Sequence, residues 1–269
     1  MSGPVAILTP LYQKILTYEE EISLGQLQHF LGGYDRYFIV PEGLQLNFPG
    51  FEKCDFDPHF FTGTDAYSQL LLSPQFYARF SEYDYVLIYQ LDCLVFSDRL
   101  GEWCQAGYDY IGAPLFRSKN KPEKGFSRVG NGGLSLRKVG SFLKVLDSRR
   151  YLDEPVPFWH EYFSVELADL KDWSPLRRPV KKLQVLRQAR RGVEWYSQQY
   201  TLNEDLFWSD RAKLFYPDFK IAPIDFGLRF AFEAHPRYCF EQNNRQLPFG
   251  CHAWAKHDRA FWEPYLIKT

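Results

Sequence analysis

The stretch YDYVLIYQLDCLVF, which runs from Tyr83 to Phe96, decides the fold. Its apolar residues are continuous rather than alternating, and this is typical of a strand buried on both faces of a parallel sheet. Gln90 and Asp92 interrupt the apolar run near its end. Ligands bind at the carboxyl ends of strands in such sheets, and an unpaired buried carboxylate is costly. We therefore expect Asp92 either to meet a metal, a cation or several donors, or to cap the turn that follows.

The segments before this stretch begin a parallel sheet. PVAILTP (Pro4–Pro10) is predicted to be a buried strand and DRYFIVP (Asp35–Pro41) a second strand. Between them, Thr17–Leu31 has apolar residues at helical spacing, and its Thr17 and Glu20 resemble a capping box. The order strand, helix, strand predicts an α/β fold of the Rossmann-like type. Its central sheet should be mixed but mostly parallel, with flanking helices.

The rest of the chain is predicted to extend this fold as a single domain over residues 1–269. Thr64–Phe80 reads as helical turns interrupted at Pro74, and Asn203–Phe215 as a helix with Asn203 at its N-cap. Residues of about 151–200 depart from the alternation of strands and helices. We interpret them as a basic, helical insertion.

Composition narrows the class of protein. The 269 residues suffice for a real core, and the net charge of −1 argues against a nucleic-acid partner. The five cysteines form no C-x-x-C, which argues against a disulfide framework and a structural zinc site. The sequence contains neither a signal peptide nor a transmembrane segment, so a cytoplasmic location is expected.

Glycines cluster at Gly130–Gly133. Glycine lets the backbone approach a ligand closely or adopt a positive φ. The alternative is a tight turn into the following strand, LSLR. The pattern is neither G-x-G-x-x-G nor a phosphate-binding P-loop, so those nucleotide fingerprints are absent.

Two further motifs carry titratable groups. Glu204 and Asp205 follow Asn203 in the first turn of a predicted helix, where the macrodipole stabilises negative charge. They could simply cap the helix, or Asp205 could serve as a general base. His252, within PFGCHAW (Pro248–Trp254), is either a hydrogen-bonded core residue or a metal ligand.

The predicted insertion contains a basic segment, Lys171–Gly192, with eight Lys or Arg residues and one Asp. A solvated charged helix would explain this composition. A contact with anionic membrane lipid or with a phosphate-bearing acceptor would explain it equally well.

In their order along the chain, these motifs resemble those of the GT-A fold glycosyltransferase superfamily, whose members use nucleotide-sugar donors. More closely, the chain is similar to a bacterial domain family of unknown function. The resemblance extends from about Val5 to Trp262 and rests on five stretches: YDYVLIYQLDCLVF, YDYIGAP, GNGGLSLR, NEDLFW and LPFGCHAW.

The resemblance implies a role for each motif. Asp92 matches the last residue of the Asp-x-Asp motif, which ligates a divalent metal, whereas Gln90 replaces its first Asp and brings no charge. His252 is implied to be the second metal ligand. The remaining implied site residues are Gly132 and Gly133 beside the donor sugar, Asp205 as catalytic base, Glu204 as a second catalytic residue, and Thr9 in the nucleotide pocket.

The implied activity is that of a hexosyltransferase that inverts the anomeric configuration. Its donor would be a nucleotide diphosphate sugar, and its acceptor a glycan or lipid-linked glycan of bacterial surface polysaccharide synthesis. Mn²⁺ or Mg²⁺ is the expected cofactor, and the imidazole ligand favours Mn²⁺. The basic segment 171–192 suggests peripheral contact with the inner membrane face.

Two other functions stay open. Because Gln90 is uncharged, the chain could be a nucleotide-sugar or carbohydrate binding module without catalysis. It could also be a nucleotidyltransferase or another metal-dependent phosphate enzyme. Such enzymes usually carry a glycine-rich, basic loop near the N-terminus, and Ile7–Lys14 (ILTPLYQK) does not resemble one.

Overall fold

The computed structural model describes residues 4–166, 179–180, 183, 187, 192–198, 200 and 202–267. In these residues a six-stranded sheet has the order β3-β2-β1-β4-β9-β6. β9 runs antiparallel to both of its neighbours, and the other strands share one direction, so the sheet is mixed and mostly parallel, as predicted. The strands are β1 (Val5–Pro10), β2 (Asp35–Pro41), β3 (Glu52–Phe56), β4 (Tyr85–Tyr89), β6 (Tyr110–Gly112) and β9 (Leu134–Lys138).

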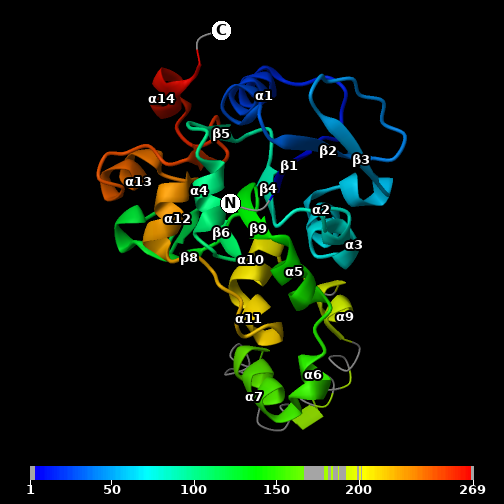
Figure 1. Cartoon of the computed structure of the whole chain (residues 1–269). Coiled ribbons are helices and arrows are strands. Elements are labelled where there is room, and N and C mark those ends of the chain that lie inside the picture. The colour runs from blue at the N-terminus through cyan, green and yellow to red at the C-terminus, as the bar shows by residue number, and fades with distance from the viewer. Residues whose placement is uncertain are drawn as a thin grey trace.

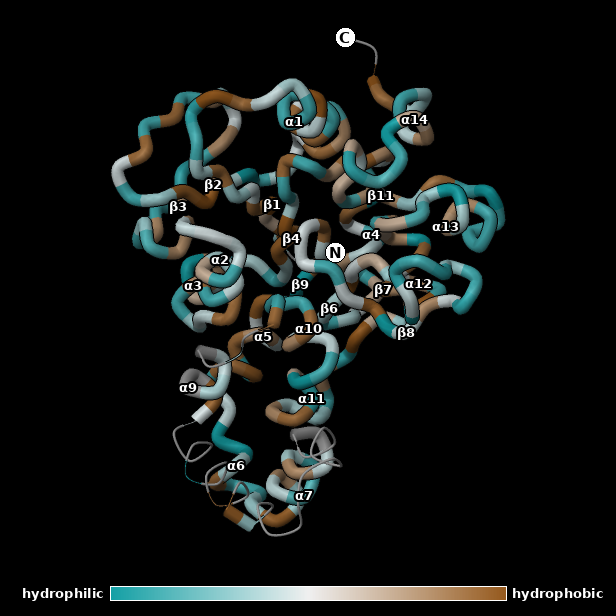
Figure 2. Tube along the Cα trace, turned by 180° about the vertical axis from the view of Figure 1, so that it is seen from behind, coloured by the Kyte–Doolittle hydropathy of each residue, from teal (hydrophilic) through white to brown (hydrophobic). Residues whose placement is uncertain are grey.

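Helices cover both faces of this sheet (Figure 1). Along β1, Ala6 and Leu8 join the cluster packed under α2, α3, α5 and α10, whereas Val5 and Ile7 join the cluster under α1 and α4. Both faces of β1 are therefore buried, which explains its continuous apolar sequence. Figure 2 shows hydrophobic segments concentrated around β1 and β4. The helices are α1 (Tyr18–Leu31), α2 (Thr64–Leu71), α3 (Pro74–Ala78), α4 (Leu100–Gln105), α5 (Val139–Leu146), α10 (Glu204–Asp210), α11 (Ala212–Phe215), α12 (Ile224–Phe230), α13 (Pro236–Gln242) and α14 (Arg259–Trp262).

Two helix boundaries follow the sequence signals. The capping box is present at the start of α1, where Thr17 Oγ1 accepts from the Glu20 N–H and the Glu20 side chain accepts from the Thr17 N–H. The break at Pro74 separates α2 from α3. Short 3-10 turns occupy Pro58–Phe61, Pro122–Lys124 and Glu263–Tyr265.

We expected the stretch Tyr83–Phe96 to contain one strand that ends at Asp92. The structure differs from this expectation. β4 ends at Tyr89, and the chain turns with a hydrogen bond from the Cys93 N–H to the Gln90 carbonyl. It then enters β5 (Leu94–Val95), which belongs to a second, three-stranded sheet with β10 (Ala231–Phe232) and β11 (Gly250–Cys251). The turn places Gln90 and Asp92 just beyond the end of β4, where the Gln90 N–H still donates to the Gly133 carbonyl at 2.9 Å.

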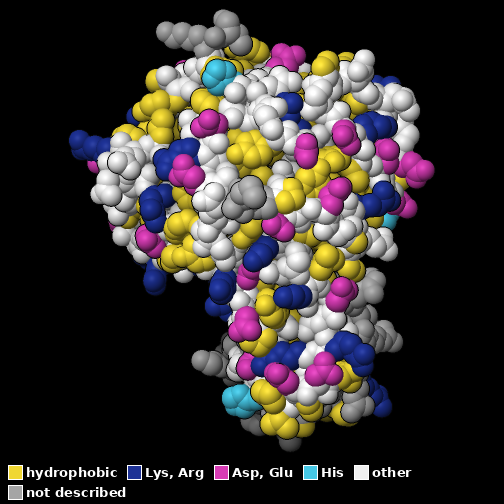
Figure 3. Space-filling view, viewed as in Figure 1, with side chains coloured by type: hydrophobic (Ala, Val, Ile, Leu, Met, Phe, Trp, Pro, Cys, Tyr) yellow, Lys and Arg dark blue, Asp and Glu magenta, His cyan; other side chains and the backbone are white. Residues whose placement is uncertain are grey.

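The described part of the predicted insertion is helical. It contains α6 (Arg150–Asp153), α7 (Pro155–Glu166) and α9 (Gly192–Gln198), which form a projection below the body of the molecule (Figure 1). Lys, Arg, Asp and Glu side chains are mixed on the face of this projection seen in Figure 3. Most of the basic segment 171–192 lies outside the described residues. No helix among those described is both long and apolar enough to cross a membrane.

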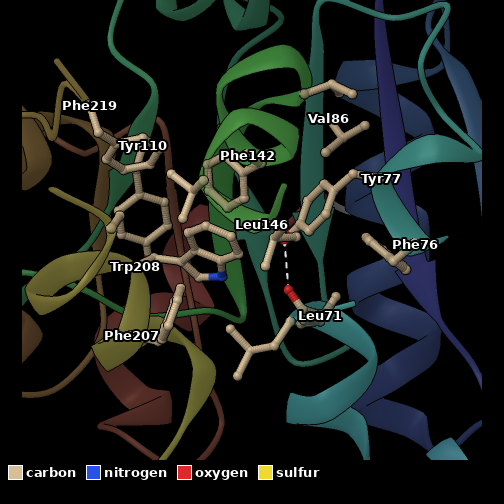
Figure 4. Close-up of a cluster of buried hydrophobic side chains, with 14 of the residues drawn as sticks. Leu71, Phe76, Tyr77, Val86, Tyr110, Phe142, Leu146, Phe207, Trp208 and Phe219 are labelled. Atoms are coloured by element: carbon tan, nitrogen blue, oxygen red, sulfur yellow. Dashed lines mark hydrogen bonds between the residues drawn. The ribbon is translucent and has the colours of Figure 1, made fainter. Parts of the chain in front are cut away.

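An aromatic cluster fixes α10 against the sheet (Figure 4). Trp208 of α10 lies with its ring centroid 4.0 Å from that of Phe142 in α5, and 5.9 Å from that of Tyr77 in α3. Trp208 and Phe142 are fully buried. Close aromatic packing of this kind stabilises a specific arrangement beyond the burial of area. The start of α10, which carries Glu204 and Asp205, is thereby held in a fixed position.

Candidate active site

The second sheet brings His252 to the end of β4. β5 pairs antiparallel with β11, and His252 follows β11 directly. The Trp254 N–H donates to the backbone carbonyl of Asp92 at 3.1 Å, which ties the two segments together. Residues that lie far apart in the sequence therefore meet at the carboxyl edge of the parallel strands, where ligands bind in such folds.

The two ring nitrogens of His252 face different groups. Nε2 lies 3.2 Å from Gln90 Oε1 and 3.3 Å from Asp92 Oδ1. Nδ1 lies 3.0 Å from Asn131 Nδ2 and 3.3 Å from Glu233 Oε1. Burial lowers the pKa of the ring, but the contacts with Asp92 and Glu233 outweigh burial and raise it to about 9. Without a metal, the ring is therefore a cation between two carboxylates at neutral pH.

The pKa values of Asp92 and Glu233 shift in the opposite direction to that of His252. Burial acts to raise the pKa of Asp92, but the hydrogen bond and charge of His252 outweigh it and hold the pKa below its ordinary value. The same balance lowers the pKa of Glu233. Both groups are ionised at neutral pH.

The side of the ring that carries Nε2 suits a divalent cation. Asp92 Oδ1 is buried and has no well-aligned hydrogen bond, although the carboxylate as a whole is half exposed. Hard cations hold ligands at about 2.0–2.6 Å, so ligands at right angles lie about 2.8–3.7 Å apart. The separations of Asp92 Oδ1 and Gln90 Oε1 from Nε2 fall in this range. Glu233 lies on the other side of the ring, and the described residues contain no group of three His, Cys, Asp or Glu around one point. Asp92, His252 and the Gln90 amide oxygen are thus the donor set that fits.

The glycine loop allows the parts of the site to approach one another. A Cβ atom at Gly133 would lie 2.2 Å from His252 Nε2 and 2.9 Å from Gln90 Oε1, and a Cβ at Gly132 would lie 2.2 Å from Glu204 Oε1. Neither position tolerates a side chain without displacing its neighbours. Both glycines are therefore required by close packing around the site.

Asn131 connects the two halves of the site. It has a positive φ of 70°, which Asn tolerates better than most residues, and its side chain is buried. Its N–H donates to Asp205 Oδ2 at 3.0 Å, while its Nδ2 lies beside His252. Its own Oδ1 accepts from the Gly133 N–H at 3.0 Å, which fixes the loop. Asp205 and His252 are therefore held in one rigid arrangement.

Asp205 lies at the start of α10. Its Oδ1 accepts from the Leu206 N–H at 2.9 Å. Burial raises the pKa of Asp205, although the backbone hydrogen bonds from Asn131 and Leu206 oppose this. Asn203 occupies the N-cap position as predicted, but its side chain makes no capping hydrogen bond. The Asp205 carboxylate takes one of the first-turn N–H groups instead.

Glu204 is bound in the interior by Arg137 of β9. The pair has two hydrogen bonds, of 2.7 Å from Nη2 to Oε1 and 3.0 Å from Nη1 to Oε2. Arg137 Nη1 also donates to the Tyr77 hydroxyl at 2.9 Å. Burial raises the pKa of Glu204 despite the guanidinium beside it. Both oxygens of Glu204 are thus engaged, and this carboxylate holds α10 to the sheet.

Two hollows open on either side of this site. One, of about 560 Å³, is lined by Gln90, Asp92, Tyr67 and the exposed Tyr12. The other, of about 860 Å³, is lined by Glu233 and Lys256 among others. His252 lines neither hollow, but its Nε2 faces Gln90 and Asp92 of the first and its Nδ1 faces Glu233 of the second.

The structure brings together all but one of the site residues expected from the sequence. Thr9 is the exception, because it is fully buried in β1, its hydroxyl has no partner among the described residues, and the first hollow is lined by Pro10 instead. Sequence reasoning missed Asn131, Arg137 and Glu233. The first two lie inside the quoted stretch GNGGLSLR, where the glycines are the more conspicuous signal, whereas Glu233 lies in no recognisable motif.

Comparison with protein-family models identifies the family of this chain. Residues 50–252 match the model described as "Protein of unknown function (DUF5672)". The match covers most of the sequence, so the chain belongs to this family. A comparison with curated proteins gave no match.

Solved structures with a similar fold include three glycosyltransferases. The apo form of GlyE from Streptococcus pneumoniae TIGR4 is 13% identical, with a TM-score of 0.43 over 99% of this chain, and this chain spans 61% of that one. The galactosyltransferase LgtC, solved with donor and acceptor sugar analogues, is 14% identical, with a TM-score of 0.42 over 98% of this chain and 97% of that one. A glycosyltransferase involved in glycosylation of the major capsid of PBCV-1 is 11% identical, with a TM-score of 0.42 over 97% and 98%.

Proposed function

We propose that the protein is a glycosyltransferase of the GT-A type that moves a sugar from a nucleotide diphosphate sugar to an acceptor hydroxyl with inversion. The observation that carries this proposal is a pair of hollows whose lining residues Asp92 and Glu233 contact opposite sides of the His252 ring. A transferase needs two binding sites that share one reacting point, whereas a binding module needs only one. Asn131 links His252 to Asp205, a carboxylate on a fixed helix end.

The hollow beside Gln90 and Asp92 is the proposed donor site. Its exposed Tyr12, with 65% of its surface accessible, offers a flat face to a base. Asp92, His252 and the Gln90 amide would hold Mn²⁺ or Mg²⁺. Such an ion offsets the charge that develops on a leaving diphosphate. Gly132 and Gly133 are the proposed neighbours of the donor sugar, since their lack of a side chain lets His252 and Glu204 pack directly against the loop.

Asp205 is the proposed general base. The acceptor oxygen attacks the anomeric carbon, the bond from that carbon to the phosphate oxygen breaks, and the nucleoside diphosphate leaves with the bond electrons. Asp205 takes the proton of the acceptor hydroxyl. Since attack comes from the face opposite to the leaving group, the configuration inverts. Glu204 has a positioning role, because its ion pair with Arg137 fixes the helix that carries Asp205.

The acceptor is proposed to be a glycan or lipid-linked glycan, with the single domain of residues 1–269 carrying both sites. The basic composition of 171–192 supports a further proposal of peripheral contact with an anionic membrane face.

A thermal-shift screen tests the proposal. The purified protein is heated with nucleoside diphosphates and their sugars, each with Mn²⁺, Mg²⁺ or EDTA. A ligand at 100 times its Kd stabilises the folded state by about 2.7 kcal/mol. We expect a metal-dependent shift with one nucleotide, followed by turnover of its sugar conjugate with an acceptor. A shift without turnover or donor hydrolysis would favour the non-catalytic binding module, and no shift with any nucleotide would contradict the donor site.

A further inference from the structure

The second hollow lies between two elements that the donor site does not use. One wall is the hairpin of β7 (Pro114–Phe116) and β8 (Phe126–Val129), and the other is the start of α13. His235 Nε2 lies 2.7 Å from the Lys119 carbonyl and joins the two walls. The hollow is therefore a preformed site and not a gap between independent loops.

Charge in this hollow is unbalanced toward cations. Its two carboxylates are already engaged, Asp258 by Arg237 at 2.6 Å and Glu233 by His252 at 3.3 Å. In the described part of the chain, Lys119 and Lys256 form no salt bridge, so their ammonium groups are available to a ligand.

The hairpin extends this cationic character. Residues 117–128 contain five Lys or Arg and one Glu, although the whole chain has a net charge of −1. Arg128, which lines the hollow, pairs with Asp210 at 3.3 Å and remains 43% exposed. Dark blue Lys and Arg side chains lie along the side of the body where Figure 1 draws β8 and α13 (Figure 3). An anion entering here meets several cations at once.

Aromatic rings form another part of the wall. Phe116 lies with its ring centroid 5.8 Å from that of Tyr238 and 5.2 Å from that of His235. Aromatic faces beside polar groups are typical of sites for small molecules with an apolar body. A sugar ring has such an apolar face.

We propose that this hollow is the acceptor subsite and that it binds an acceptor sugar carrying a phosphate group. Lys119, Arg128 and Lys256 hold the phosphate, Phe116 and Tyr238 contact the sugar, and the reacting hydroxyl lies toward Glu233 and His252. This inference rests on the proposed function, because it assigns the second substrate of the same reaction. The phosphate can belong to a soluble sugar phosphate or to a lipid-linked sugar.

Calorimetric titration in EDTA tests the soluble source. The probes are inorganic phosphate, glucose 1-phosphate and, as the neutral counterpart, methyl glucoside. We expect the phosphate probes to bind, and the double variant Lys119→Gln/Arg128→Gln to bind them about ten-fold or more weakly, since hydrogen bonds to charged groups contribute this much. Lys124→Gln is the matched control, because Lys124 belongs to the same loop but does not line the hollow.

Sedimentation with vesicles tests the lipid source. The vesicle assay uses a background in which the Lys and Arg residues of 171–192 are changed to Gln, so that this segment does not hold the protein on anionic lipid. In that background, phosphatidylcholine vesicles with phosphatidic acid should retain the parent protein and the Lys124→Gln variant, but not the double variant, if the phosphate is lipid-linked. Loss of binding in the Lys119→Gln/Arg128→Gln variant, in either the calorimetric or the vesicle assay, supports the subsite. If the double variant equals its parent protein in both assays, or if nothing binds, the inference is wrong.

The thermal-shift screen with nucleotide sugars separates this inference from the proposed function. The double variant should retain the shift of the wild type, because neither substituted residue lines the donor hollow. A wild type that binds phosphate but no nucleotide contradicts the glycosyltransferase proposal. A wild type that binds nucleotide but no phosphate contradicts only the acceptor subsite.

Discussion

Arg137 and Glu204 form an ion pair with two hydrogen bonds in the interior, with side chains 0% and 6% exposed. Removing one partner of such a pair leaves an uncompensated buried charge, which typically costs about 3–5 kcal/mol. We therefore expect Glu204→Gln to lower the free energy of unfolding by that amount in urea titrations.

The pair of Arg150 with Glu161 is the control for this prediction. It also has two hydrogen bonds, at 2.7 and 2.9 Å, but Glu161 is 46% exposed. Exposed pairs contribute about 0–1 kcal/mol, so Glu161→Gln should have little effect. Equal, small losses in both variants would show that Glu204 does not anchor α10.

Gly133→Ala should disturb the site at its centre. The added methyl group overlaps the His252 ring, and overpacking of this kind typically costs about 1–3 kcal/mol. Displacement of the ring should also remove the metal-dependent thermal shift with the donor nucleotide. Gly140→Ala in α5 is the control, because a Cβ there meets no atom within 4 Å and Ala in a helix should stabilise by about 0.5–1 kcal/mol. Retention of the donor shift by Gly133→Ala would contradict the role proposed for this loop in the site.

Asp205→Asn should abolish most of the transfer reaction. A general base contributes about 10²–10⁴-fold, so kcat should fall by this factor. Product formation is measured by chromatography with the donor found in the thermal screen, and circular dichroism checks that the fold is retained. Turnover close to that of the wild type would exclude Asp205 as the base.

The pH dependence of kcat should report the same carboxylate. Burial and the charge of Glu233 raise the pKa of Asp205, whereas its backbone hydrogen bonds and the charge of Arg137 lower it, and the net shift is upward. The base must be ionised, so activity is lost as pH falls through this raised pKa. The acid limb should lie above the ordinary value of about 3.9 for Asp. A limb at or below that value would contradict the assignment.

Neutralising the basic segment should weaken membrane binding. Each Lys or Arg near an anionic surface contributes about 1 kcal/mol, and residues 171–192 contain eight of them. Vesicles that contain phosphatidylserine should sediment the wild type but not a variant with these residues changed to Gln. Equal sedimentation of both proteins would rule out this contact.

Much of the architecture was predictable because it depends on local pattern. The continuous apolar runs identified β1 and β4 as buried strands and β2 as a second strand, and the Thr17–Glu20 capping box marked the start of α1. The predicted end of β4 was wrong by a few residues, because the strand ends at Tyr89 and not at Asp92. Leu94 and Val95 are as apolar as β4, and nothing local reveals that they pair with β11 in another sheet.

The residues of the site also divide into those that were recognisable from the sequence and those that were not. Gln90, Asp92, Asp205 and His252 were recognisable as polar groups in unusual positions, and the structure brings them together, although their chemical roles stay predictions. Glu233 could not be identified from the sequence, because it follows β10, a two-residue strand without a pattern of its own. Arg137 was missed because nothing in the sequence shows that its partner is Glu204, 67 positions away.

The sequence by itself determined the α/β class, the strand, helix, strand order of its first elements and which residues could carry chemistry, since these depend on periodicity and residue type within short windows. Only the tertiary structure decided that His252 stands between Asp92 and Glu233, and that a hollow opens on each side of it. The physical reason is that long-range strand pairing and the close packing of Gly132 and Gly133 set these distances, and such contacts join segments that share no local signal.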